Sequence, residues 1–543
     1  MHNYSRHFNI RKTPQSQPIP RLKMSGAGPG REPEQVKNDA GGYVFQLDDW
    51  NRLDRFLVLG SSGGTYYVSE RKLTLDSAAC VQHCLEADSK RAINRIVEIS
   101  EAGRAPGNDP ALFALAIAAA SPIPDTNTYA LLQLPRVART GTHLFHFAEY
   151  VNSLRGWGRG LRTAIERWYV NKPDPALAYQ LLKYQARDGW SHRDLIRLAH
   201  VKPRTLEQEK LFAWATRSKR GRELPDSVLI RTFEKIKDSR DKDLVVEAMR
   251  QSGLTREMIP TWFLNDKEIW RALDDVGIPL GALIRNLGNL SKCGLLIQGQ
   301  YEVIDKVISR ITDQEAIKHS RLHPLDFLKA SLTYSQGCGV RGQGSWPVVP
   351  KIVDGLNEAF YKSFANVEPT GKRFCIGIDI SGSMSHGVAG IEYLPCIVAA
   401  LALALVTFRV ETMVSVVGFT TKPRPIPISS YSTLVSLGQW YKLNHIPEGT
   451  DCSVPFDWAI TNKVPTDIFV LITDGETWAG SEHPVQSLNR YRRAMGIESR
   501  LVVVAMTPTG STIADPKDPF SLNVVGFDTV VPGVIQQFAL GEF

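Results

Sequence analysis

One carboxylate and two hydroxyl groups stand on alternate residues at Asp379, Ser381 and Ser383, directly after the apolar and glycine run Phe374–Ile378. Such a run predicts a strand that is buried on both faces of a parallel sheet. Open α/β sheets place their sites at the carboxyl ends of these strands. Carboxylate and hydroxyl oxygens are hard donors, which suit Mg²⁺ better than a soft metal. The pattern therefore predicts a Mg²⁺ site whose low ligand charge leaves the ion able to accept an acidic group from a partner.

Two later segments add donors of the same kind. Thr450 lies in a polar loop, and a second apolar strand that begins at Asp467 ends in Thr473 and Asp474. In this order the donors resemble the metal-ion-dependent adhesion site of von Willebrand factor A domains. A strand end with a capping aspartate is the plainer alternative. The resemblance implies a metal site formed by Asp379, Ser381, Ser383, Thr450 and Asp474.

Length and composition limit the class of protein. A chain of 543 residues is too long for one core and predicts two or three domains. Its apolar share of 43% and charged share of 22% are typical of a soluble globular protein. The apolar run 397–408 is too short to span a membrane. Seven cysteines without Cys-x₂-Cys pairs argue against a disulfide framework or a zinc site. We therefore expect a reducing compartment, which is the cytoplasm or, if the cell is eukaryotic, the nucleus.

Charge is distributed unevenly along the chain. Residues 371–543 contain 12 Lys and Arg against 15 Asp and Glu, a net charge of −3. The whole chain has a net charge of +8, so the remainder has +11. A basic excess in the larger part suggests an anionic partner, for which nucleic acid is the usual candidate. Solubility alone is the other explanation, and charge does not choose between them.

The amino-terminal part contains a predicted arm and a predicted hairpin. Residues 1–40 are rich in Arg, Pro, Ser and Gly and predict a disordered basic arm. Residues 55–60 and 65–68 flank a Gly/Ser stretch and predict a short β-hairpin. The stretch 60–64 matches a Gly-x-Ser-x-Gly nucleophile elbow, but that motif needs a following helix, so Ser62 is rejected as a nucleophile. Residues 337–342 match Gly-x-Gly-x-x-Gly without a surrounding βαβ unit, so dinucleotide binding is rejected too.

Between about residues 73 and 364 the apolar residues recur at helical spacing, and prolines and glycines interrupt them at intervals that suit paired helices. This pattern predicts a HEAT-like helical solenoid. Within it, Lys183 and Arg187 are four residues apart and are predicted to share a helix face. Gly189 is predicted to end that helix and Ser191 to cap the next one. In this second helix, basic residues recur at helical spacing up to His200. This segment suits phosphates and unpaired bases, although a merely solvated face fits its spacing equally well.

Many blocks, in order from about residue 41 to the carboxyl terminus, resemble the TROVE-domain family, the Ro autoantigens. This resemblance implies a ring of HEAT-like repeats over residues 41–365, closed by a von Willebrand A domain over residues 366–543. The blocks are Gly41–Phe45, Gly63–Tyr67, Thr140–Phe145, Trp157–Arg159, Lys183–Pro203, Leu283–Gly288, Arg321–Pro324, Val367–Arg373 and Thr473–Gly480.

The same resemblance implies a function. Members of the family bind small structured Y RNAs and single-stranded 3′ ends of misfolded RNAs, as ribonucleoproteins of RNA quality control, and are not themselves nucleases. By position, Lys183, Arg187 and His200 match residues implicated in Y RNA binding. We expect a monomeric RNA-binding scaffold rather than an enzyme, with no membrane contact and an acidic protein partner for the metal. Two alternatives stay open. One is a metal-dependent protein-adhesion module, and the other is a Mg²⁺-dependent phosphoryl-transfer enzyme in which Asp379 is the acceptor, although Ser381 stands where such an enzyme needs a second carboxylate.

Overall fold

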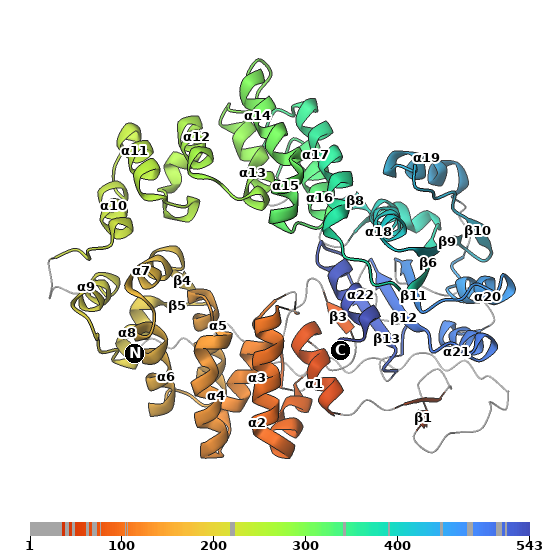
Figure 1. Cartoon of the computed structure of the whole chain (residues 1–543), viewed down its shortest axis with the longest axis horizontal. Helices are drawn as coiled ribbons and strands as arrows, with labels where there is room; N and C mark the ends of the chain where they lie inside the picture. The colour runs from red at the N-terminus through yellow and green to blue at the C-terminus, as the bar shows by residue number, and fades with distance from the viewer. Residues whose placement is uncertain are drawn as a thin grey trace. The chain divides into compact units, whose positions relative to one another are not determined.

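The computed structural model divides the chain into two compact units, and each is described by itself (Figure 1). Residues 85–103 and 107–366 form a helical unit, and residues 1–84, 104–106 and 367–543 form a sheet unit. The structure describes residues 35–37, 43–45, 49–60, 65–67, 73–75, 78–103, 105, 107–217, 223–339, 344–388, 391–445, 449–474, 482–506, 513–515 and 518–543.

Helices of the helical unit pack mainly on near neighbours in sequence, as in a repeat protein. Helix α3 packs on α4 and α5, and α17 packs on α14 and α16 (Figure 1). The helices are α2 (Ala79–Ala102), α3 (Asp109–Ala120), α4 (Pro124–Val137), α5 (Gly141–Leu154), α6 (Arg159–Val170), α7 (Asp174–Lys183), α8 (His192–Ala199), α9 (Leu206–Ala215), α10 (Val228–Ile236), α11 (Lys242–Ser252), α12 (Lys267–Val276), α13 (Leu280–Lys292), α14 (Tyr301–Thr312), α15 (Gln314–Ser320), α16 (Pro324–Ser335) and α17 (Pro350–Lys362). Three short 3₁₀ helices, η1 (Arg256–Met258), η2 (Thr261–Asn265) and η3 (Ser363–Asn366), and the strands β4 (Ala186–Arg187) and β5 (Trp190–Ser191) complete it.

The sheet unit is built on one sheet with the strand order β10-β9-β6-β11-β12-β13-β3. All its neighbouring strands are parallel except the edge strand β10, which is antiparallel to β9. The strands are β3 (Thr65–Tyr67), β6 (Arg373–Asp379), β9 (Met413–Phe419), β10 (Pro423–Pro425), β11 (Ile468–Thr473), β12 (Arg500–Ala505) and β13 (Ser521–Val525). The other elements are β1 (Gln35–Lys37), β2 (Tyr43–Phe45), β7 (Gly387–Val388), β8 (Ile391–Pro395), η4 (Gly382–Ser385), α1 (Asp49–Leu59), α18 (Cys396–Val410), α19 (Leu434–Asn444), α20 (Val454–Thr461), α21 (Pro484–Met495) and α22 (Val531–Leu540).

The predicted fold class, a helical repeat region followed by a von Willebrand A-like parallel sheet, is confirmed. Strand β6 lies between β9 and β11, and its residues from Phe374 to Asp379 are buried, as the apolar run predicted. Strand β11 is buried along its whole length. None of the described helices is long and apolar enough to cross a membrane. Closure of the helices into a ring stays a prediction.

The predicted β-hairpin at residues 55–68 is wrong. Residues 49–59 form helix α1, in which Leu53, Phe56 and Leu57 are fully buried. Only Thr65–Tyr67 is a strand, and its partner is β13, more than 450 residues later. The short apolar run 56–59 fits both a strand and a buried helix, and its periodicity does not distinguish the two. Gly60 therefore follows a helix and precedes a strand, the reverse of a nucleophile elbow. In the predicted arm, Gln35–Lys37 pairs with Tyr43–Phe45, and the rest lies outside the described residues.

A buried histidine ties three helices of the helical unit together. His192, the first residue of α8, contacts the hydroxyl of Tyr169 in α6 through Nδ1 (2.7 Å) and the carbonyl oxygen of Gln180 in α7 through Nε2 (3.2 Å). Burial lowers the pKa of His192 to about 4, so the ring is neutral at pH 7. Only a protonated Nε2 can donate to a carbonyl, so Nδ1 must accept the tyrosine proton.

Gly141 leaves the space that His192 fills. A Cβ atom at position 141 would lie 2.9 Å from Nε2 of His192 and 2.9 Å from Cβ of Tyr184. We expect Gly141→Ala to lower the free energy of unfolding by about 1–3 kcal/mol, because overpacking forces neighbours to shift. Urea denaturation of the full chain measures this change. Gly438→Ala, in α19, is the control, since nothing lies within 4 Å of its new Cβ; equal losses in both variants would contradict the explanation.

Candidate metal centre and nucleic-acid interface

The carboxylate of Asp379 lies at the carboxyl end of β6 and is fully buried. Its Oδ1 accepts a hydrogen bond from the backbone N–H of Ser381 (2.8 Å), and its Oδ2 accepts one from the hydroxyl of Thr473 (2.9 Å). The parallel pairing of β6 with β11 produces the second contact, because Ile378 lies opposite Ile472 and both strands end at the same edge. Thr473, the last residue of the neighbouring strand, is thus a site residue that the predicted ligand set does not contain.

Ser381 and Ser383 lie next to each other, with their Oγ atoms 3.0 Å apart. Ser381 is buried and Ser383 is exposed, so the pair runs from the interior to solvent. The hydroxyl of Tyr441, in α19, donates to the backbone oxygen of Ser381 (3.0 Å) and fixes the loop. The structure therefore brings together the three residues of the Asp-x-Ser-x-Ser motif.

Thr450 and Asp474 lie on neighbouring segments. Thr450 is buried, and the backbone N–H of the next residue, Asp451, donates to the carbonyl oxygen of Thr420 (3.0 Å), directly after β9. This contact places the Thr450 segment at the carboxyl end of the strand beside β6. Asp474 directly follows β11, and its charge contributes to the raised pKa of Asp379. Gly475 lies outside the described residues.

The surroundings of Asp379 disfavour its negative charge. Burial raises its pKa to about 6, and the negative charge of Asp474 adds to the rise that the hydrogen bonds from Ser381 and Thr473 oppose. No ion pair to Asp379 occurs in the described part of the chain. No group of three or more His, Cys, Asp or Glu side chains there is placed to hold a metal. An ion at this site would therefore depend on hydroxyl oxygens as much as on carboxylates, and the donors fit a hard divalent cation.

The segment with the predicted cations is a helix end and a hairpin. Lys183 is the last residue of α7, and its ammonium group donates to the hydroxyl of Tyr179 (2.8 Å), which raises its pKa. Arg187 lies in β4, opposite Trp190 of β5. The prediction that Lys183 and Arg187 share a helix face is wrong. Asp188 and Gly189 both have positive φ angles, 51° and 79°, as in the two-residue Asp-Gly turn of a hairpin.

The hairpin is fixed to the helices by a histidine between two carboxylates. His146, in α5, contacts Asp109 through Nδ1 (2.6 Å) and Asp188 through Nε2 (2.9 Å). Burial alone would lower the pKa of His146, but the hydrogen bond to Asp109 and the charges of both carboxylates raise it overall. This contact engages the carboxylate beside Arg187 and leaves the guanidinium group exposed.

Helix α8 begins as predicted and ends at His200. Ser191 and Asp194 form a capping box: Ser191 Oγ accepts from the Asp194 N–H (3.3 Å), and Asp194 accepts from the Ser191 N–H (3.0 Å). His200 is the C-cap in a left-handed conformation (φ 51°), and its side chain is exposed. The eight residues of α8 separate His200 from the hairpin by about 12 Å. The three predicted RNA contacts thus lie along a surface rather than in one pocket.

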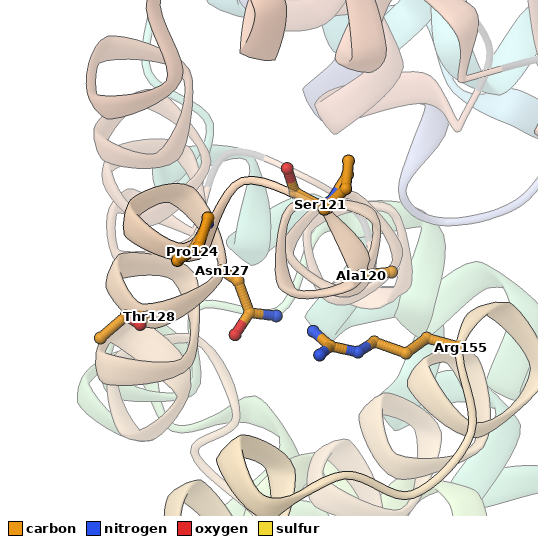
Figure 2. Close-up of a pocket in the computed structure, with 7 residues that line it drawn as sticks. Ala120, Ser121, Pro124, Asn127, Thr128 and Arg155 are labelled. Atoms are coloured by element: carbon orange, nitrogen blue, oxygen red, sulfur yellow. The ribbon is translucent and has the colours of Figure 1, made fainter.

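A small hollow lies on the same unit where α3 ends and α4 begins (Figure 2). Its volume is about 320 Å³, and the side chains of Arg155 and Asn127 point toward each other across it (Figure 2). Both donate to the carbonyl oxygen of Ala119, Arg155 at 3.0 Å. The two side chains are thus held by one backbone acceptor at the end of α3.

Comparison with known proteins agrees with this geometry. The TROVE domain matches residues 36–333, more than half of the chain, and the Ro60 vWA domain matches residues 373–539. The chain belongs to the TROVE-domain (Ro60) family. Relatives named RNA-binding protein RO60 occur in Deinococcus radiodurans (40% identical, covering 94% of this chain and 96% of the relative) and in Caenorhabditis elegans (34% identical, covering 94% and 90%).

A solved structure supports the membership of this Ro-family chain. The crystal structure of the Deinococcus radiodurans RO (RSR) protein matches it with a TM-score of 0.85 at 38% identity. The match covers 91% of this chain and 100% of the other. The predicted family is therefore confirmed.

Proposed function

We propose that this Ro-family protein is an RNA-binding scaffold of RNA quality control, which binds small structured Y RNAs and single-stranded 3′ ends of misfolded RNAs. The observation that carries the proposal is a group of exposed arginines without carboxylate partners in the helical unit. Within the described residues, none of these four makes an ion pair or a side-chain hydrogen bond. They are Arg159, Arg162, Arg187 and Arg193.

Three arginines of the sheet unit instead form ion pairs with carboxylates. Arg373 pairs with Asp467 (2.6 Å), Arg490 with Asp457 (2.6 Å), and Arg492 with Asp518 (3.1 Å). Paired guanidinium groups would have to lose a carboxylate before they could bind phosphate, whereas unpaired ones would lose only water and counterions. The names of both relatives, RNA-binding protein RO60, agree with RNA as the anion.

We further propose that Asp379, Ser381 and Ser383 hold Mg²⁺ or Mn²⁺, with Thr450 and Asp474 completing the ligand set directly or through water. The bound ion would supply a positive charge for an acidic group of a protein partner. Tyr441 would hold the loop through its hydrogen bond to Ser381, and Thr473 would hold the carboxylate through its hydrogen bond to Asp379. A reducing compartment agrees with the seven cysteines, all of which are free thiols.

The first prediction concerns the RNA surface. Changing Lys183 and Arg187 to Ala together should weaken binding of a single-stranded RNA. It should also flatten the salt dependence of binding by about 1.4, because each lost phosphate contact removes about 0.7 from the slope of log K against log salt. Fluorescence anisotropy at several salt concentrations measures both changes. The control changes two exposed lysines of α15 and α16, Lys318 and Lys329, to Ala and removes the same charge. Equal slopes for both double variants would contradict a local site.

His200 should act on structured RNA in particular. We expect His200→Asn to weaken binding of a small structured RNA more than that of a plain single strand. Asn tolerates the left-handed backbone that position 200 adopts, so the fold is preserved. Thermal unfolding of the same samples is the control. Unchanged RNA binding together with a lower Tm would assign His200 a structural role only.

The metal prediction uses two variants. Asp379→Ala should abolish Mn²⁺ binding and leave RNA affinity within a few-fold, because the exposed arginines that would bind RNA belong to the helical unit. Thr473→Val should lower Mn²⁺ affinity about 10- to 100-fold, because it removes the hydroxyl that orients the Asp379 carboxylate. Isothermal titration of the full chain measures both, with the exposed Glu498→Ala as control. Full Mn²⁺ affinity in Asp379→Ala would refute the assignment.

The scaffold proposal also predicts an absence of turnover. Incubation with Mg²⁺ and labelled RNA or nucleoside triphosphate should give neither cleavage nor hydrolysis, because Ser381 replaces the second carboxylate that phosphoryl transfer to Asp379 would need. Turnover that disappears in Asp379→Asn would instead support the phosphoryl-transfer alternative.

A further inference from the structure

Two tryptophans of the helical unit lie in contact beside the hairpin. Trp157 lies in the loop between α5 and α6, and Trp190 lies in β5; their ring centroids are 5.6 Å apart at an interplanar angle of 55°. Both are half-buried, whereas Trp168 and Trp270 are buried in the core. The pair therefore presents aromatic surface to solvent, where its burial contributes less to folding than that of a core residue.

The two rings are held to different degrees. The indole N–H of Trp190 donates to Glu149 Oε2 in α5 (2.6 Å), and its backbone pairs with β4, so this ring is fixed. Trp157 stands between Gly156 (φ 81°) and Gly158, and a Cβ at either glycine would meet nothing within 4 Å. Its indole N–H has no hydrogen-bond partner among the described residues. Trp157 thus contacts the fixed ring of Trp190, and the backbone on both sides of Trp157 has open space around it.

Two exposed arginines without an ion pair among the described residues lie close to this pair in the chain or across the hairpin. Arg187 lies directly opposite Trp190 in the hairpin, which puts their side chains on one face. Arg159 follows Trp157 by two residues and is exposed. The nearby carboxylates make contacts other than with these arginines: Glu149 accepts from Trp190 and from Ser153 (3.2 Å), and Asp188 contacts His146. An aromatic surface beside free guanidinium groups matches a flat, apolar ring joined to an anion, which is the chemistry of an unpaired nucleotide.

We propose that Trp157, backed by Trp190, is a stacking site for an unpaired base of bound RNA, with Arg187 and Arg159 on the adjoining phosphates. The inference rests on the proposed RNA-binding function and adds the position at which a base, rather than the backbone, is held. Stacking accepts any base, so this contact supplies affinity for an unpaired nucleotide without reading its sequence.

The test compares Trp157→Leu with the wild-type full chain, using a single-stranded RNA and a series in which one base at a time is replaced by an abasic ribose. We expect Trp157→Leu to weaken binding about tenfold, within the range for loss of one stacked base, and to leave the salt slope unchanged. One abasic position should cause the same loss in the wild type and no further loss in the variant. Trp157→Phe should keep most of the affinity. Trp262→Leu, at another exposed tryptophan of the unit, should keep all of it.

Failure of the inference differs from failure of the function. If the wild type binds RNA and Trp157→Leu binds equally well, the pair only packs and the inference is wrong. Stacking would also be refuted if Trp157→Leu weakened binding of every abasic RNA as much as it weakens binding of the intact RNA. Absence of RNA binding in the wild type would refute the scaffold function itself. Should Trp157→Leu unfold, 2-aminopurine placed at each position of the RNA replaces it as the test. Quenching at one position is expected in the wild type, and its absence at all positions would overturn the inference.

Discussion

Parallel pairing on both sides of β6 is the constraint on which the sheet unit depends. Because β9 and β11 run in the same direction as β6, the carboxyl ends of all three strands lie at one edge of the sheet. The polar residues that follow these strands therefore lie near Asp379. A buried carboxylate without a cation is costly, and the hydrogen bonds from Ser381 and Thr473 offset only part of this cost. The same pairing that hides the strand from water thus buries a carboxylate whose charge a bound cation would offset, and the proposed metal site rests on this feature.

In the helical unit the groups without a partner of opposite charge are arginines rather than a buried carboxylate. Three carboxylates near the hairpin contact neighbours inside the fold: Asp188 and Asp109 contact His146, and Glu149 accepts from Trp190. The nearby Arg159 and Arg187 make no ion pair within the described part of the chain. They belong to the basic excess of +11 that the chain carries outside residues 371–543, and the attraction of such an excess for anions falls with added salt.

The sequence predicted features that depend on a single strong physical signal. A strand buried on both faces must be apolar throughout, so β6 and β11 were recognisable, and the polar residues after them had only one edge to occupy. Residues 49–59 were harder, because a short apolar run fits a strand and a buried helix equally well. Arg55 of this helix donates to the carbonyl oxygen of Pro519, a contact more than 450 positions away that no local pattern contains. The Lys183–Arg187 error was local and avoidable. Asp188-Gly189 is a strong hairpin signal, and it outweighed the spacing of the two cations. The contact between Thr473 and Asp379 could not be inferred without the strand register.

Strand β3 gives the chain an order in which it must be completed. Thr65–Tyr67 leaves the ribosome early, but its partner Asn523–Val525 is among the last segments to be made. During synthesis the early strand must wait while some 450 residues follow, and closing so long a loop is slow because the entropy is lost before any contact is gained. A fragment that begins at residue 367 would leave the edge of β13 uncovered, and exposed parallel edges invite pairing with other chains. The amino-terminal segment thus ends the sheet in a strand of only three residues, and an expressed fragment without this segment would expose the longer edge of β13 instead.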